Sequence, residues 1–168
     1  MNYYHRETVV TPNGDTIEPV TVDMVVQDLQ LEESAVVNRE RLTLLIRRVR
    51  AKVEDALNKR IAVVVKRAEV RTPVNEVSVD APIIKVAYIE VYDPETGEWT
   101  TVDGEIEHSD REVYLPDECL DRVVRIVYSV GMAPCPYQYI GDILEGVRAE
   151  WAGQPWTPPD YHDRRSNA

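Results

Sequence analysis

The chain has 168 residues, 43% of them hydrophobic, and a formal net charge of −11 at pH 7. This length excludes two large domains and fits one domain with short appendages, and the hydrophobic share is enough for one core. The negative charge argues against a surface that binds nucleic acid by neutralising phosphates, because that mode requires clustered Lys and Arg.

Residues 1–20 are predicted to form an N-terminal arm. Pro12, Asn13-Gly14 and Pro19 are turn-forming residues, and the segment holds too few apolar side chains to build a core of its own. The Asn-Gly pair favours a hairpin between residues 8–11 and 16–20. A flexible arm that becomes ordered on a partner is an equal alternative.

A short helix is expected next, capped by Thr21 and about two turns long. Its apolar face is formed by Val22, Val25, Val26 and Leu29. Helices this short are unstable alone, so it must pack on a neighbour. Residues 30–34 would then connect it to a second helix in an αα-hairpin, with Ser34 or Asn38 as the cap.

The second helix spans residues 39–58 and is the longest periodic segment. Apolar residues recur at helical spacing, and they are Leu42, Leu45, Ile46, Val49, Val53, Ala56 and Leu57. Its other face is basic. Residues 21–60 carry a net charge of +1 and residues 61–152 a net charge of −10. This asymmetry favours like subunits that meet basic face to acidic face, with the candidates Arg41, Arg47, Arg48 and Lys52, although a solvated acidic surface is an equal interpretation.

Strand patterns follow Asn58. We expect strands at residues 60–70, 83–92, 98–102, 105–108, 112–115 and 122–130. The 83–92 strand is apolar on both faces, which predicts a central strand covered on each side. Residues 93–97 carry turn chemistry for a hairpin, and residues 72–82 are expected to be a turn region. In the last strand Val124, Ile126, Tyr128 and Val130 share one face.

A closing helix is predicted from Tyr137 to about Gly153. Its apolar positions are Ile140, Ile143, Leu144, Val147 and Trp151. The tail, residues 153–168, has three prolines and no period, so we expect it to be extended. Trp156 and Tyr161 either fold back on the domain or serve as anchors for a partner. The sequence thus predicts an arm (1–20), an α+β domain with a mostly antiparallel sheet or sandwich (21–152) and a tail (153–168).

No pattern for a metal or a cofactor is present. His5, His108 and His162 lie in three separate segments, and the seven glycines match no phosphate-binding loop. Neither Cys119 nor Cys135 belongs to a C-x-x-C pair, so we expect buried free thiols in a reducing compartment. Cys135 is the one candidate nucleophile, but no base is identifiable.

The membrane is excluded as a partner by the same sequence. The longest uninterrupted apolar run is residues 61–65, whereas a spanning helix needs roughly 20 residues.

The order of elements resembles the head-tail connector (adaptor) proteins of long-tailed bacteriophages. The resemblance covers about residues 20–152. The matching stretches are Val20-Thr21-Val22-Asp23, Val53-Glu54, Leu57-Asn58-Lys59-Arg60, Pro82-Ile83-Ile84-Lys85-Val86, Ile89-Glu90-Val91-Tyr92-Asp93, Val124 to Gly131, and Pro136 with Ile140, Ile143 and Leu144. This sequence departs from the family at Asn58-Lys59, where a glycine is usual, at Met132, and in its long ends.

The resemblance implies a non-enzymatic virion protein, made in the host cytoplasm and located at the head-tail junction. Such proteins form a ring, commonly of twelve copies, that joins the portal to a downstream tail or stopper protein and extends the DNA channel without specific DNA binding. Because their C-terminal helix and tail engage the portal, the implied portal-binding residues are Ile143, Val147, Trp151, Trp156 and Tyr161.

Two alternatives from other classes remain at this stage. One is a small hydrolase that uses the carboxylates of residues 90–121. The other is a monomeric module that binds a peptide along a free sheet edge.

Overall fold

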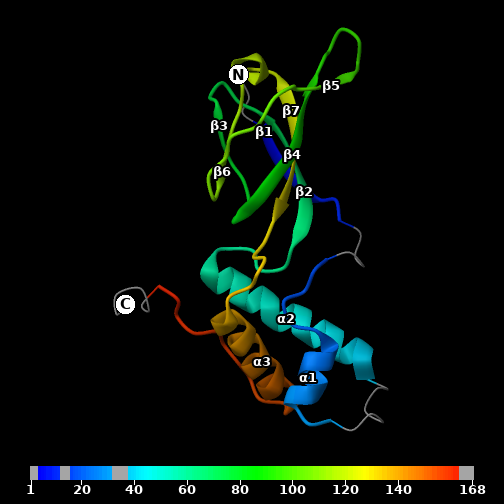
Figure 1. The fold of residues 1–168 in the computed structure, drawn as a ribbon, viewed down its shortest axis with the longest axis vertical. Coiled ribbons are helices and arrows are strands. Elements are labelled where there is room, and N and C mark those ends of the chain that lie inside the picture. The colour runs from blue at the N-terminus through cyan, green and yellow to red at the C-terminus, as the bar shows by residue number, and fades with distance from the viewer. Residues whose placement is uncertain (1–3, 12–15, 32–37, 163–168) are drawn as a thin grey trace. The chain divides into compact units, whose positions relative to one another are not determined.

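The computed structural model describes residues 4–11, 16–31 and 38–162. It confirms an α+β fold and separates two compact units (Figure 1). The β unit comprises Met1–Ile17 and Val63–Ala133, and the helical unit comprises Glu18–Ala62 and Pro134–Ala168. Each unit is assembled from two separate stretches of chain, and the predicted division at residues 20 and 152 stays a prediction.

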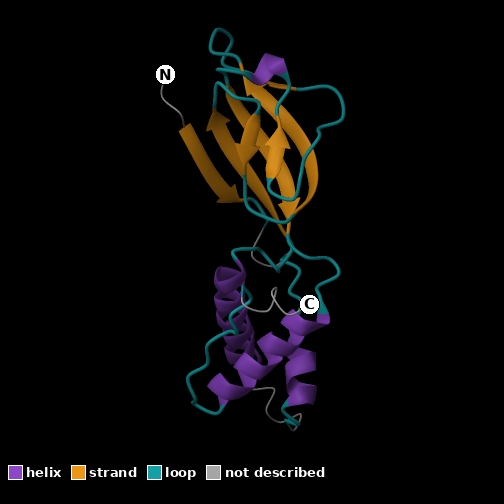
Figure 2. Ribbon diagram, turned by 90° about the vertical axis from the view of Figure 1, so that its left-hand side faces the viewer, coloured by secondary structure: helices purple, strands orange, loops and turns teal. Residues whose placement is uncertain are grey.

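The β unit contains a five-stranded antiparallel sheet and a two-stranded one (Figure 2). The larger sheet has the order β1 (Tyr4–Val9), β2 (Val64–Arg71), β7 (Val123–Val130), β4 (Ile83–Tyr92) and β5 (Trp99–Thr101). The smaller sheet pairs β3 (Glu76–Ser78) with β6 (Glu112–Tyr114). The predicted β4–β5 hairpin and the β7 strand are confirmed, whereas β3 lies in the segment that was expected to be only a turn region.

The predicted hairpin within the first 20 residues is wrong. Strand β1 pairs with β2 along its whole length, from Tyr4 opposite Arg71 to Val9 opposite Lys66. Ile17 forms a bridge with Val63 instead of pairing with β1. The Asn13-Gly14 pair lies outside the described residues. Residues 4–9 of the predicted arm are thus an edge strand of the sheet.

Strand β4 lies one position from the centre and is not covered on both faces. Its buried residues are Ile83, Val86, Ile89 and Val91, while Ile84 and Tyr88 are each 43% exposed. The pairing with β7 shifts register twice, between residues 83 and 85 and between residues 86 and 88. Each bulge inserts one extra residue and moves the inward positions by one. The continuous apolar pattern of β4 therefore results from two shifts in its register with β7, and it does not mean that both faces of the strand are buried.

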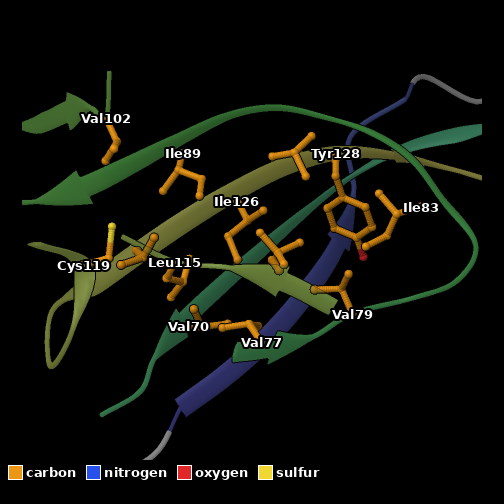
Figure 3. Packing of buried hydrophobic residues seen from close by; sticks show 14 of the residues in the cluster. Val70, Val77, Val79, Ile83, Ile89, Val102, Leu115, Cys119, Ile126 and Tyr128 are labelled. Carbon is orange, nitrogen blue, oxygen red and sulfur yellow. The ribbon is translucent and has the colours of Figure 1, made fainter. Parts of the chain in front are cut away.

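The core of the β unit lies between the two sheets (Figure 3). Val124, Ile126, Tyr128 and Val130 of β7 are each fully buried, as their predicted common face requires. Val77 and Leu115 cover them from the side of the smaller sheet. Burial of this kind contributes roughly 1.5 to 3 kcal/mol for each large side chain.

A charged group is also buried at the rim of this core. The Lys66 ammonium donates to Glu7 at 2.6 Å and to Asp80 at 3.0 Å, and the Tyr128 hydroxyl accepts from the Asp80 amide at 3.3 Å. Burial is the main cause that raises the pKa of Tyr128 far above its usual range, so the phenol stays neutral. These bonds join β1 and β2 to the loop before β4.

The helical unit contains α1 (Val22–Asp28), α2 (Arg39–Leu57) and α3 (Tyr137–Trp151). The Thr21 cap is confirmed, because its hydroxyl accepts from the Met24 amide at 3.2 Å. Asn38 occupies the N-cap position of α2 without a side-chain capping bond, and Ser34 lies outside the described residues. No described helix has the combination of length and hydropathy that crossing a membrane would require.

Helix α2 buries the apolar face that its sequence predicts. The side chains of Leu42, Val49 and Val53 have no exposed surface, and Leu45, Ile46 and Leu57 are nearly as covered. The helix ends at Asn58, whose φ of +50° is left-handed, a conformation that Asn tolerates better than most residues.

Candidate functional site

Every residue assigned above to portal or subunit contacts lies in the helical unit, on α2, α3 and the segment after α3. Helix α2 provides the basic side chains and α3 provides the apolar ones.

Glu150, near the end of α3, joins α3 to the basic face of α2. Its carboxylate accepts from Arg48 Nε and Lys52 Nζ, each at 2.7 Å, and its side chain is only 6% exposed. Residues 48 and 52 are one helical turn apart, which places both cations on the same side of α2. The Lys52 ammonium also donates to the backbone carbonyl of Trp156 at 3.0 Å. Two of the four predicted subunit-contact residues thus hold the protein's own C-terminal segment.

The other two predicted subunit-contact residues also have partners within the unit. The Arg41 guanidinium lies 4.7 Å from the centre of the Trp151 ring, a cation–π distance. The Arg47 guanidinium lies 3.8 Å from the Glu18 carboxylate. Since all four cations contact groups of the same unit, their role between subunits stays a prediction.

A glycine in α3 creates the space that receives Trp156. A Cβ atom at Gly146 would lie 2.6 Å from Val49 Cγ1 and 2.7 Å from Trp156 Cε3, closer than real Cβ contacts. The missing side chain lets the indole pack directly against the helix backbone and against α2, and Trp156 is only 9% exposed. The tail therefore folds back on its own unit, which was one of the two alternatives for its aromatic residues.

Tyr161 is a second attachment point of the tail. Its hydroxyl donates to the buried Asp142 carboxylate at 2.8 Å, and its ring meets Tyr139 edge to face with 5.5 Å between centroids. The side chain is 7% exposed. Tail residues 154–162 lack regular secondary structure, yet both of their aromatic side chains are core residues of the helical unit.

The predicted portal-binding residues are thus mostly buried in this structure. Ile143 and Val147 have no exposed surface and Trp151 is half-buried. The exposed aromatic group of α3 is instead Tyr137 in its first turn, which is 90% exposed. The portal role of the five residues stays a prediction.

Stability of the helical unit should depend on acidic pH through Glu150. Burial of this carboxyl, the largest single influence, raises its pKa, but the hydrogen bonds and charges of Lys52 and Arg48 outweigh burial and leave the pKa below its usual 4.5. A lowered pKa in the folded state contributes stability that is present above the unfolded pKa and lost as the pH falls through the folded one. We expect the free energy of unfolding to decline from about pH 5 to pH 3.

The Glu150→Gln variant isolates this contribution. It should be less stable than the wild type near neutral pH and should lose less stability over the same acidic range, as measured by urea unfolding at each pH. Parallel pH profiles of the two proteins would show that another carboxyl group is responsible.

The groups considered for catalysis show no arrangement typical of an active site. Both cysteines are free, and burial raises the pKa of each thiol to about 11, so neither is a reactive thiolate near neutral pH. The pKa of Asp93 is lowered, chiefly by the Glu95 backbone amide, which is the opposite of what a general acid requires. In the described part of the chain, no group of three or more His, Cys, Asp or Glu residues is placed to hold a metal.

Sequence reasoning missed Gly146 and Asp142, which contact the tail, and Glu150, which joins α3 to α2. Gly146 carried a usable signal: it lies between Ile143 and Val147 on the apolar face of a helix, where glycine costs about 1 kcal/mol relative to alanine and needs a packing reason. Glu150 and Asp142 gave no local signal, because their partners are distant in the chain.

The whole chain can be compared with known proteins at this point. No family model matches it, and no curated protein matches it. Its fold is similar to a chain in the neck of an empty GTA particle, computed with C6 symmetry, with a TM-score of 0.70 and 14% identity over 90% of this chain and 87% of that one. It is also similar to a chain in the neck of a native GTA particle, computed with C12 symmetry, with a TM-score of 0.64 and 14% identity over 92% and 86% of the two chains. At this identity the likeness establishes the fold.

Proposed function

We propose that this chain is a structural protein of the neck of a phage-like particle, where copies of it form a ring between the portal and the tail. The observation that carries this proposal is the extent of the fold match, which includes both units and most of each chain. The matched chains come from neck assemblies of sixfold and twelvefold symmetry. A ring of twelve copies satisfies both symmetries, so we propose twelve.

In this role the chain needs interfaces and no reaction centre. The acidic surface, with 30 Asp and Glu against 19 Lys and Arg, would let DNA move through the ring without tight phosphate contacts. The partners would be further copies of the chain, the portal and a downstream tail or stopper protein, in a virion assembled in the host cytoplasm.

Electron microscopy of the purified chain, alone and mixed with portal protein, tests this function. The expected result is a closed ring of sixfold or twelvefold symmetry that sits on the portal. A chain that stays monomeric and does not associate with the portal contradicts the proposal.

We further propose that α3 and the tail carry the portal contact, with the exposed Tyr137 ring at its centre. Large exposed aromatic side chains are the common anchors of protein interfaces. The Tyr137→Ser variant should weaken capture of the portal about tenfold. Leu44→Ser on α2 is the matched control, because Leu44 is also an exposed apolar residue, at 61%. Equal capture by both variants would place the contact elsewhere.

A further inference from the structure

The five-stranded sheet has one face that takes no part in the core of the β unit. Directly paired residues of antiparallel strands point to the same face. Arg6 pairs with Glu69, Glu69 with Arg125, and Arg125 with Glu90, so one row of side chains crosses four strands. Tyr88, which pairs with Val127 on the same side, is 43% exposed. We call this surface the open face.

The open face is basic although the β unit is acidic. The unit contains eight Lys and Arg against seventeen Asp and Glu, a net charge of −9. Five of the eight cations point outward from strands of the open face, together with only Glu69 and Glu90. These cations are Arg6, Arg67, Arg71, Lys85 and Arg125. The open face therefore has a charge of +3, and the remainder of the unit has −12.

The acidic residues are concentrated in residues 93–121, which we call the acidic loops. This stretch holds eleven Asp and Glu and a single cation, Arg111, and nine of the eleven acidic side chains are exposed. Asp93, Asp103 and Glu118 line a hollow of about 490 Å³ together with Arg122.

Apart from β5 and the margins, the acidic loops lie on the side of the sheet away from the open face. Val102, Val113 and Cys119, all within the acidic loops, are buried in the core cluster, so these loops cover the core side of the sheet. Within one copy the two surfaces meet at their margins, where Arg71 Nε donates to the Asp121 backbone carbonyl at 3.1 Å and Arg125 stacks on Trp99. The rest of each surface can be presented to a neighbour, one on each side.

We propose that the open face of one copy docks on the acidic loops of the next copy. A contact between two different surfaces is heterologous and closes into a ring when the rotation per subunit allows it. Opposite net charges favour this pairing, and the exposed Tyr88 side chain supplies apolar contact. The inference rests on the proposed function, because it names the surfaces by which the proposed ring would assemble.

A second copy fits the open face better than nucleic acid does. Glu69 and Glu90 interrupt the cations in the central row and would repel a phosphate backbone. The Arg125 guanidinium is bonded to Glu69 at 3.3 Å and stacked 3.7 Å from the centre of the Trp99 ring, which commits it to its own sheet.

Complementary charge reversals test the contact in the full chain. The face variant carries Arg67→Glu and Lys85→Glu, and the loop variant carries Asp103→Lys and Glu118→Lys. The face variant changes the open face from +3 to −1, and the loop variant changes the hollow lined by Asp93, Asp103, Glu118 and Arg122 from −2 to +2. In each variant alone the open face and this hollow therefore have the same sign, so we expect self-association, measured by sedimentation velocity at low salt, to fall at least tenfold. An equimolar mixture should recover it, because each variant then offers the surface that the other lacks. Circular dichroism and thermal unfolding of each variant check that it is folded.

A charge-matched control separates a docking surface from an effect of net charge. Glu40→Lys with Glu145→Lys gives the helical unit the same charge change as the loop variant. The inference is overturned if the control variant restores the self-association of the face variant as well as the loop variant does, or if neither of them restores it. It is also overturned if the wild-type chain shows no self-association at low salt.

The outcomes distinguish the inference from the proposed function. If each variant alone forms rings as well as the wild type does, the inference is wrong and the proposed ring function is unaffected. A chain without self-association that also fails to bind the portal removes both. If the wild type binds duplex DNA and the face variant does not, while both self-associate equally, the open face binds nucleic acid and the inference is overturned.

Discussion

Replacement of Trp156 by alanine should destabilise the helical unit by about 3 to 5 kcal/mol, the range for deletion of a large aromatic side chain from a core. The indole is 9% exposed and packs where α3 has no side chain, at Gly146. Its removal leaves a cavity bordered by helix backbone and by Val49, which the surrounding helices can fill only in part. Urea unfolding followed by the helical circular dichroism signal measures the effect.

Two glycines of α3 provide matched controls for this prediction. Gly146→Ala places a methyl group against Val49 and Trp156, and we expect a loss of about 1 to 3 kcal/mol from overpacking. Gly141→Ala changes the same residue type in the same helix, but a Cβ there meets nothing within 4 Å. That variant should gain about 0.5 to 1 kcal/mol from reduced backbone entropy of the unfolded chain.

The combination of Gly146→Ala with Trp156→Ala should cost less than the sum of the two single changes, because the added methyl group occupies part of the cavity. An unchanged unfolding midpoint in Trp156→Ala would show that the indole is not a core residue in solution.

The burial of the tail aromatic side chains also affects experiments on portal attachment. Deletion of residues 154–168 removes Trp156 and Tyr161 from the core of the helical unit, so loss of attachment by a truncated chain would not identify a binding residue. Likewise, Arg48→Glu places two carboxylates where Arg48 and Glu150 now pair. Substitution of exposed residues such as Tyr137 avoids both complications.

Glu54→Ala should destabilise the helical unit by about 3 to 5 kcal/mol, the cost of breaking a buried charge pair by removal of one partner. The Glu54 carboxylate is 6% exposed and accepts from the Ile61 and Ala62 amides at 2.7 and 3.0 Å. It also pairs with Arg50 at 2.6 Å, whose side chain is 12% exposed. Alanine leaves the Ile61 and Ala62 amides without this acceptor. It also removes one of the two carboxylates that pair with the nearly buried Arg50 guanidinium, and only Glu18, at 2.7 Å, remains.

Glu54→Gln separates the two contributions, because its amide oxygen can still accept from the backbone while its charge is lost. We expect its cost to be smaller than that of alanine. Asp55→Asn, at the next and exposed position of α2, should change the free energy of unfolding by less than about 0.5 kcal/mol. Equal stabilities for the alanine variant and the Asp55 control, measured by urea unfolding, would contradict the assigned role of Glu54.

The helices were predictable because their information is local. The spacing of Leu42, Val49 and Val53 gives the period and the buried face of α2, and Thr21 is a capping residue at the start of α1. Strand β7 was predictable for the same reason, since its alternation is regular from Val124 to Val130. In these segments a residue's environment depends on its near neighbours in sequence.

The two bulges of β4 and the short strand β3 could not be predicted in this way. A bulge is a mismatch between two strands, and Ile84 and Ala87 carry no mark of being the extra residues. Strand β3 has three residues and exists because β6 pairs with it. The partner of β1 lies more than fifty residues away, beyond the reach of turn chemistry at Asn13-Gly14.

The candidate site was only partly predictable, because charge patterns do not name partners. The basic residues of α2 were predicted to contact another subunit, but Arg48 and Lys52 have a carboxylate partner about one hundred residues later in their own chain, in Glu150. The tail aromatics were recognised as anchors, but whether they anchor to this chain or to another depends on the space above Gly146. Both facts are properties of packing between distant segments.

The chain crosses between its two units three times, near residues 17, 62 and 133. During synthesis on the ribosome, β1 and α2 therefore emerge long before β7 and α3, the elements that complete their respective units. The β unit cannot close until β7 has emerged, and the helical unit closes later, when Trp156 has emerged. The surfaces of both units therefore form late, so nascent chains would be poor nuclei for premature polymerisation on polysomes.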